Sequence, residues 1–204
     1  MKGLQIAAGL AAFASANSTP IYGKYPGWIQ GRNKLGIQVQ LYEDYLCSDS
    51  KRFNAVFEEV LAIEWLGGAV YDMIGVGLTP LPLPYHNHTY QVNQLVPYFM
   101  AQCDIGKTCL NNEYKDFAFD NLSTILHQKS DTSQTDFEAW WAAKVADHFQ
   151  LDEADVASCY SQNDIYTTDS NLRAMWKYGT AKGVNATPLV FINGVKLDTV
   201  PMTV

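Results

Sequence analysis

The residue best suited to chemistry is Cys47, in the stretch LYEDYLCSDSKRF. It lies between a run with the two-residue period of a strand and a run with the period of a helix. At the first turn of a helix, unpaired backbone N–H groups and the positive end of the helix dipole favour thiolate over thiol. Three residues later the chain has Ser50, where a redox dithiol has its second cysteine. The motif can attack a disulfide, with Ser50 donating a hydrogen bond to the thiolate, but it cannot form an internal disulfide.

A lone cysteine before a helix is also typical of a small buried side chain, so the surrounding elements matter. Apolar and polar residues alternate from Lys34 to Tyr42, which predicts a strand. After Ser50 the apolar residues recur every three or four positions, which predicts a helix ending at Gly67-Gly68. A second strand is expected from Ala69 to Leu78. This strand, helix, strand order favours a parallel pair.

The rest of the chain is expected to be helical and then to return to strand. From about Thr89 to Lys182 the patterns are mostly helical, and the aromatic residues there predict a helical core. The last segment has a β-rich run from Leu189 to Ile192, followed by Asn193-Gly194. Because Asn-Gly favours a tight type I′ turn, a hairpin is predicted.

Two motifs carry a resemblance to a known family. GVNATPLVFINGV, residues 183–195, resembles the return motif GVxGTPxxFxNG of the DsbA-like branch of the thioredoxin superfamily. PLPYHNHTY, residues 82–90, resembles an element of its eukaryotic members with a CxxS motif, and Cys159 lies where the branch often has a helical cysteine. The resemblance implies an α/β, thioredoxin-like fold with a helical insertion domain. The expected parts are a signal peptide at 1–16, a thioredoxin-like domain at 17–88 and 183–204, and the insertion at 89–182.

The same resemblance implies a thiol-disulfide exchange protein that acts on cysteine-containing polypeptides and needs no cofactor. Cys47 and Ser50 are the expected catalytic residues. Thr187 and Pro188 occupy the cis-proline position, which implies that they lie against Cys47 and bind an extended substrate through the main chain of Thr187. A binding or chaperone-like module that has lost turnover is the main alternative. A glutathione-using or peroxide-reacting enzyme is the third reading.

The N-terminus predicts a secretory protein. Lys2, an apolar run to about Ala14 and the small residues of Ala14-Ser15-Ala16 are typical of a signal peptide at 1–16. The apolar run is shorter than the roughly 20 residues of a bilayer span, so no membrane anchor is expected after cleavage. The expected location is outside the cell or in the lumen of the endoplasmic reticulum. A net charge of −7 without clustered Lys or Arg argues against nucleic acid and anionic membranes as partners.

A secretory location permits disulfides, and four cysteines allow three full pairings. Cys103 and Cys109 are six residues apart with Gly106 between them, so a local disulfide is favoured. No second CxxC or HxxxH lies nearby, so a zinc site is not expected. Glycosylation is predicted at three sequons, Asn17, Asn87 and Asn121. A fourth sequon, at Asn185, is disfavoured because Pro188 directly follows its Thr187.

Two pairs of polar residues could affect Cys47: His86 and His88 within the PLPYH element, and Glu43 and Asp44 just before the cysteine. His86 and His88 point the same way in an extended segment, which permits a shared metal or a base near Cys47, but two histidines without a third ligand do not predict a metal site. Glu43 and Asp44 are expected to be exposed carboxylates that oppose the thiolate only weakly, through solvent.

Overall fold

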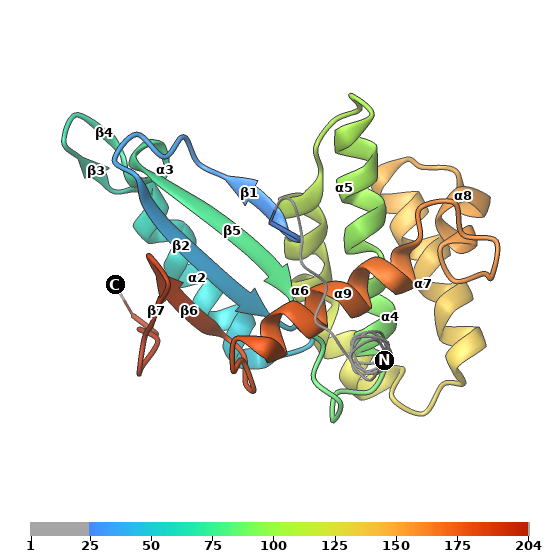
Figure 1. Cartoon of the computed structure of the whole chain (residues 1–204). Coiled ribbons are helices and arrows are strands. Elements are labelled where there is room, and N and C mark those ends of the chain that lie inside the picture. The colour runs from blue at the N-terminus through green and yellow to red at the C-terminus, as the bar shows by residue number, and fades with distance from the viewer. Residues whose placement is uncertain (1–24, 204) are drawn as a thin grey trace, which may run out of the picture.

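The computed structural model describes residues 25–203 (Figure 1). The expected signal peptide at 1–16 and the sequon at Asn17 lie outside the described residues. Five strands form one sheet, in the order β1-β5-β2-β6-β7. Their bounds are Trp28–Gln30 for β1, Ile37–Glu43 for β2, Ile74–Pro80 for β5, Leu189–Ile192 for β6 and Val195–Lys196 for β7.

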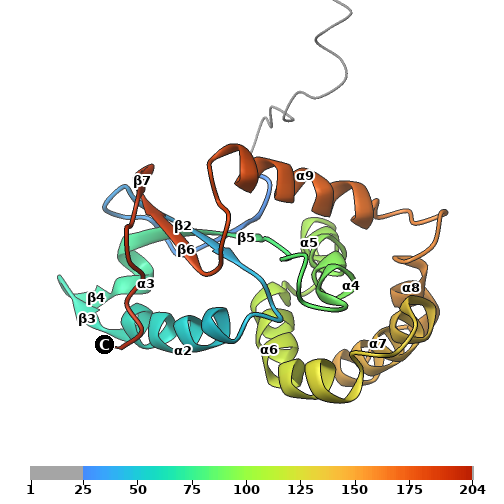
Figure 2. The same ribbon diagram turned by 90° about the horizontal axis from the view of Figure 1, so that it is seen from below.

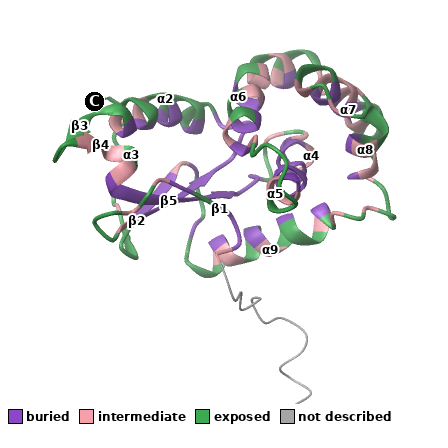
Figure 3. Cartoon of the chain, turned by 90° about the horizontal axis from the view of Figure 1, so that it is seen from above, coloured by how far each residue is buried: buried purple, intermediate pink, exposed green. Residues whose placement is uncertain are grey.

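The helix α2, Ser48–Ala62, connects β2 to β5, and these two strands are parallel. The predicted strand, helix, strand unit is therefore confirmed. The buried side chains of α2 include Phe53, Phe57 and Leu61, which recur at helical spacing and face the sheet. β5 is buried along its whole length, as expected for a strand with a neighbour on each side and helices over its faces (Figure 3).

The segment between α2 and β5 differs from the prediction. α2 ends at Ala62, five residues before Gly67, and a small hairpin of β3, Glu64–Trp65, and β4, Gly68–Ala69, follows. Leu66 and Gly67 both have positive φ and make the tight turn of this hairpin. A short helix α3, Val70–Met73, then occupies what was expected to be the start of the second strand.

β6 and β7 form the predicted hairpin, with positive φ at both Asn193 and Gly194. β6 pairs antiparallel with β2, which places the C-terminal motif beside the strand that leads to Cys47. The periodicity did not predict β1, which is only three residues long and pairs with β5 at the edge of the sheet.

Six helices follow β5 within residues 25–203, where a helical region was predicted. Pro97 lies in the first turn of α5, where its missing N–H breaks no hydrogen bond. Ser133 caps α7 by accepting a hydrogen bond from the backbone N–H of Asp136. The helices are α4, Thr89–Gln94; α5, Val96–Asp104; α6, Asn111–Gln128; α7, Gln134–Phe149; α8, Glu153–Ser158; and α9, Thr168–Ala181.

The helical core is aromatic, as predicted. Phe99 and Phe137 stack on Tyr114 and Trp141 respectively, and the Trp141 indole N–H donates to the Tyr114 hydroxyl. α9 connects the two halves of the molecule, since it contacts both α5 and β5 and lies on the opposite face of the sheet from α2 (Figure 2). The insertion bounds at 89 and 182 stay predictions. Within residues 25–203 no helix combines the length and apolar character that a bilayer span requires.

Candidate functional site

Cys47 lies at the N-terminus of α2, where the sequence predicted it. It is the residue before the first turn, its backbone C=O accepts from the N–H of Lys51 at 3.0 Å, and its side chain does not cap the helix. The side chain is 7% exposed, so it is nearly buried. Its sulfur donates to the backbone C=O of Thr187 at 3.4 Å. The thiol is therefore held at the positive end of the helix dipole, next to a segment 140 residues away in sequence.

The Thr187-Pro188 peptide bond is cis. It directly precedes β6, whose pairing with β2 aligns Leu189 with Tyr42 and Val190 with Leu41. Cys47, Thr187 and Pro188 are therefore brought to one place by the sheet.

Ser50 is completely buried in the first turn of α2. Its hydroxyl has no hydrogen-bond partner among residues 25–203, and the Cys47 thiol donates to Thr187 instead. The expected hydrogen bond from Ser50 to Cys47 is absent in this structure, so it stays a prediction for the thiolate form.

Asp44 corrects one expectation, because it is fully buried rather than exposed. Its carboxylate accepts from the backbone N–H groups of Leu46 at 2.9 Å and Leu83 at 3.0 Å. Side chains of His86, Thr89 and Asn93 also bind it, His86 Nδ1 at 2.7 Å. Asp44 thus connects the turn before Cys47 to the PLPYH element, a link that no periodicity in the sequence indicated.

The two histidines of the PLPYH element do not share a site. His86 contacts Asp44, whereas His88 Nε2 contacts the backbone C=O of Lys129 at 3.0 Å and its ring stacks on Phe137. In the part of the chain that the structure describes, no group of three or more His, Cys, Asp or Glu side chains is arranged to hold a metal ion.

Glu43 is the second correction, since this carboxyl is also buried. Burial raises its pKa to about 8, although the ammonium of Lys115 acts in the opposite direction. Lys115, on α6, is itself completely buried and binds Asn54 and Glu58 of α2. The end of β2 therefore faces a charged cluster between α2 and α6 rather than solvent.

Replacing Glu43 with Gln should weaken the pH dependence of stability. Between the ordinary pKa of 4.5 and the folded value of about 8, the folded state binds more protons than the unfolded state. The free energy of unfolding of the wild type should therefore fall as the pH rises through this window, by about 1.4 kcal/mol for each unit of pKa difference at most. Urea unfolding at several pH values between about 5 and 8 measures the slope.

Glu59→Gln, an exposed position on α2, is the matched control and should leave the slope unchanged. A wild type whose stability rises with pH across this window, or a Glu43→Gln variant with the same slope as wild type, would contradict the expectation.

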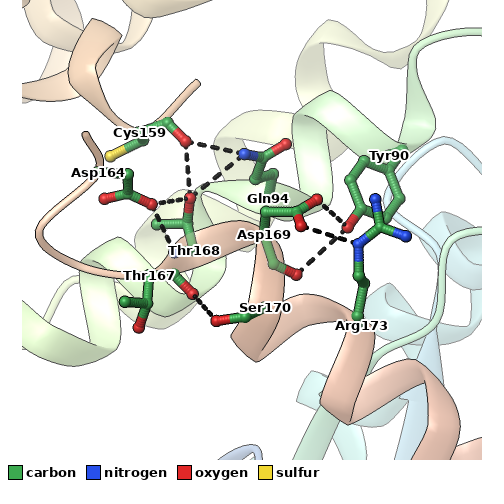
Figure 4. A network of polar contacts seen from close by, with 9 residues as sticks. All are labelled: Tyr90, Gln94, Cys159, Asp164, Thr167, Thr168, Asp169, Ser170 and Arg173. Atoms are coloured by element: carbon green, nitrogen blue, oxygen red, sulfur yellow. Dashed lines mark hydrogen bonds and ion pairs between the residues drawn. The ribbon is translucent and has the colours of Figure 1, made fainter. Parts of the chain in front are cut away.

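The other cysteines are accounted for within residues 25–203. Cys103 and Cys109 form a disulfide, with Cα atoms 4.5 Å apart. Cys159 is buried and free, and burial raises the pKa of its thiol. Its C=O, not its sulfur, accepts from Gln94 and Thr168, both at 2.8 Å (Figure 4). Cys159 therefore lies in the helical core, where burial disfavours its thiolate. Of the two free thiols in the described chain, Cys47 is the one placed at a helix N-terminus.

No protein-family model matches the chain, and its sequence matches no curated protein. Solved structures do match it in shape. MdbA, a thiol-disulfide oxidoreductase from Corynebacterium diphtheriae, is 16% identical with a TM-score of 0.60 over 92% of this chain and 93% of its own. DsbA from Chlamydia trachomatis is 14% identical with a TM-score of 0.61, over 90% and 88%. BdbD from Bacillus subtilis is 12% identical with a TM-score of 0.59, over 86% and 85%.

The chain has a DsbA-like thioredoxin fold. This confirms the predicted fold class, an α/β thioredoxin-like fold with a helical insertion. In this DsbA-like fold the end of β2, the start of α2 and the turn before β6 converge at Cys47. The sequence missed Asp44 as a positioning residue, although the PLPYH resemblance had marked the segment to which it binds.

Proposed function

We propose that this protein catalyses thiol-disulfide exchange in polypeptides, with Cys47 as its single nucleophile. The observation that carries the proposal is the position of the Cys47 thiol, at the N-terminus of α2 and in contact with the residue before a cis proline. Unpaired N–H groups at a helix start stabilise a thiolate, which is the reactive form. The fold shared with a thiol-disulfide oxidoreductase such as MdbA supports the same reaction class.

The reaction needs no external oxidant. The Cys47 thiolate attacks one sulfur of a substrate disulfide, so that a mixed disulfide forms and the other substrate sulfur leaves as a thiolate. A second substrate thiolate then attacks the substrate sulfur of the mixed disulfide. A new substrate disulfide forms and Cys47 leaves as a thiolate. The number of disulfides is unchanged, so the net reaction is isomerisation.

Ser50 and Thr187 have supporting roles in this proposal. Once Cys47 has lost its proton, Thr187 no longer receives a hydrogen bond from the sulfur, and the C=O of Thr187 is available to the main chain of an extended substrate. The unpaired hydroxyl of Ser50 becomes a donor for the thiolate. Because Ser50 replaces the resolving cysteine, mixed disulfides should persist until a substrate thiol releases them.

A binding module without turnover is the second candidate. The low exposure of Cys47 favours it, because a substrate disulfide must reach a sulfur that is nearly covered. In this reading the segment at Thr187 and Pro188 binds polypeptides, and the Cys47 thiol serves only to donate a hydrogen bond to Thr187.

A secretory location is part of the proposal. The signal peptide predicted at 1–16 and the disulfide between Cys103 and Cys109 support it. Asn87 is an exposed sequon in a loop, and its side chain donates to the C=O of Ser130 at the surface. Asn121 lies within α6 and donates to the C=O of Phe117 one turn earlier, so Asn87 is the better glycan acceptor. The expected partners are cysteine-containing polypeptides of that pathway.

Trapping of mixed disulfides tests the catalytic reading. Purified protein is incubated with a scrambled disulfide-bonded test protein, quenched with acid and separated without reductant. Wild type should give a covalent adduct that reductant removes, and Cys47→Ser should give none. Cys159→Ser, which removes the other free thiol, is the matched control and should trap normally. If wild type forms no adduct while the test protein still binds, the binding-module candidate replaces the catalytic one.

A further inference from the structure

A cavity of about 480 Å³ runs along β1, at the edge of the sheet. β1 pairs with β5 on one side, and no other strand within residues 25–203 pairs with it. Trp28, Ile29 and Gln30 all line the cavity. Since side chains alternate along a strand, Ile29 faces the other way from its two neighbours. A cavity that touches all three therefore follows the open edge of the strand.

Three side chains fix the hydrogen-bonding character of this cavity. The indole N–H of Trp28 can only donate, and it donates to Asn112 Oδ1 at 3.1 Å. The amide nitrogen of Asn112 must then face Gln30, and it donates to Gln30 Oε1. This chain of hydrogen bonds orients the Gln30 amide, so that its oxygen is occupied and its buried nitrogen is left as a donor without a partner in the described chain. Gln30 is only 8% exposed, and its nitrogen has no partner among residues 25–203.

Asn111 supplies an acceptor in the same cavity wall. Asn111, at the start of α6, is 8% exposed, lines the cavity and has a buried Oδ1 without a partner in the described chain. A buried donor or acceptor left unpaired costs about 1–3 kcal/mol, so two of them in one cavity indicate a ligand that satisfies both. Among residues 25–203, the charged residues that line the cavity are Asp104 and Glu113, and no Lys, Arg or His of that range lines it. Phosphates and carboxylates are therefore disfavoured, and a neutral ligand is favoured.

We propose that the cavity binds an extended polypeptide segment that adds as a strand to the open edge of β1 and inserts a carboxamide side chain, Asn or Gln, between Gln30 and Asn111. The main chain of such a segment would pair with the unpaired edge of β1. A carboxamide carries an acceptor for the Gln30 N–H and a donor for Asn111 Oδ1. β1 and β6 lie at different positions in the sheet, with β5 and β2 between them. Cys47 does not line the cavity, so the proposed site is separate from it and does not rest on the proposed exchange reaction.

The test uses the full chain labelled with ¹⁵N for NMR, with Cys47→Ser so that oxidation of this thiol cannot link two copies of the protein. The probe is the acetylated and amidated peptide Thr-Val-Gln-Val-Thr, titrated to millimolar concentration. Amide shifts should concentrate at Gly27 to Gln30 and at Asn111. Replacing the peptide Gln with Glu or Leu should weaken binding about tenfold, which is about 1.4 kcal/mol.

A protein variant gives an independent check. Gln30→Glu keeps the shape and the acceptor for Asn112 but removes the unpaired N–H donor, so it should weaken binding of the Gln peptide about tenfold. Gln128→Glu, at an exposed position near the end of α6, is the matched control and should bind as the parent does. No shifts at the edge of β1, shifts around Thr187 instead, or equal binding of the Gln, Glu and Leu peptides would each overturn the proposal. The peptide comparison stands even if Gln30→Glu fails to fold.

Discussion

Replacing Ser50 with cysteine should turn the protein into a dithiol oxidase. Positions 47 and 50 are three residues apart at the start of α2, and side chains at that spacing in a helix are about 5–6 Å apart at Cβ, close enough to bridge with a small adjustment. The Ser50 hydroxyl makes no hydrogen bond within residues 25–203, so the substitution removes no side-chain hydrogen bond that the structure records. The variant, first oxidised with glutathione disulfide and then freed of it, should transfer its disulfide to a reduced test protein. Wild type should transfer none.

The matched control is Ser48→Cys, which places the new thiol beside Cys47 in sequence but at an exposed position. Neighbouring residues do not face each other on a helix, so this variant should not transfer a disulfide. Counting thiols in the test protein measures the reaction directly. If Ser50→Cys forms the internal disulfide and still oxidises nothing, Cys47 is not accessible to polypeptides, and the exchange proposal fails.

Replacing Asp44 with Ala should cost about 3–5 kcal/mol of the free energy of unfolding, the range measured when one member of a buried charged network is removed. The buried N–H groups of Leu46 and Leu83 would lose their acceptor, as would the side chains that bind the same carboxylate. Because Asp44 connects the turn before Cys47 to the PLPYH element, mixed-disulfide formation should also slow. Urea unfolding gives the stability change, and the trapping assay gives the change in rate.

Asp49→Ala is the control for this result, because Asp49 is an exposed acidic residue in the first turn of α2 and should cost less than about 1 kcal/mol. Asp44→Asn keeps one carbonyl oxygen, so its loss of unfolding free energy should lie between those of Asp44→Ala and Asp49→Ala. An Asp44→Ala variant with the urea midpoint of the wild type would show that this network does not hold the site together.

The sequence by itself determined the elements whose residues are neighbours along the chain. A change of period from two to about three and a half predicted β2 and α2, and the Asn193-Gly194 pair predicted the final hairpin. β5 was also expected, although its start was placed at Ala69 and it begins at Ile74. The position of Cys47 before a helix came from the same change. Short elements were less predictable: β1 has three residues, and the β3-β4 hairpin displaced the expected end of α2. Such segments contain too few periods to distinguish strand from loop.

The tertiary structure alone decided the environment of the reactive residue. Glu43 and Asp44 were predicted to be exposed, because the neighbouring residues in the sequence do not indicate that α2, α6 and the PLPYH element cover them. The partners of Asp44 and Cys47 come from about 40 and 140 residues away, and only chain folding brings them together. His86 and His88 diverge for the same reason, since each binds a different distant segment. Local pattern therefore places the thiol, and long-range packing decides which groups surround it.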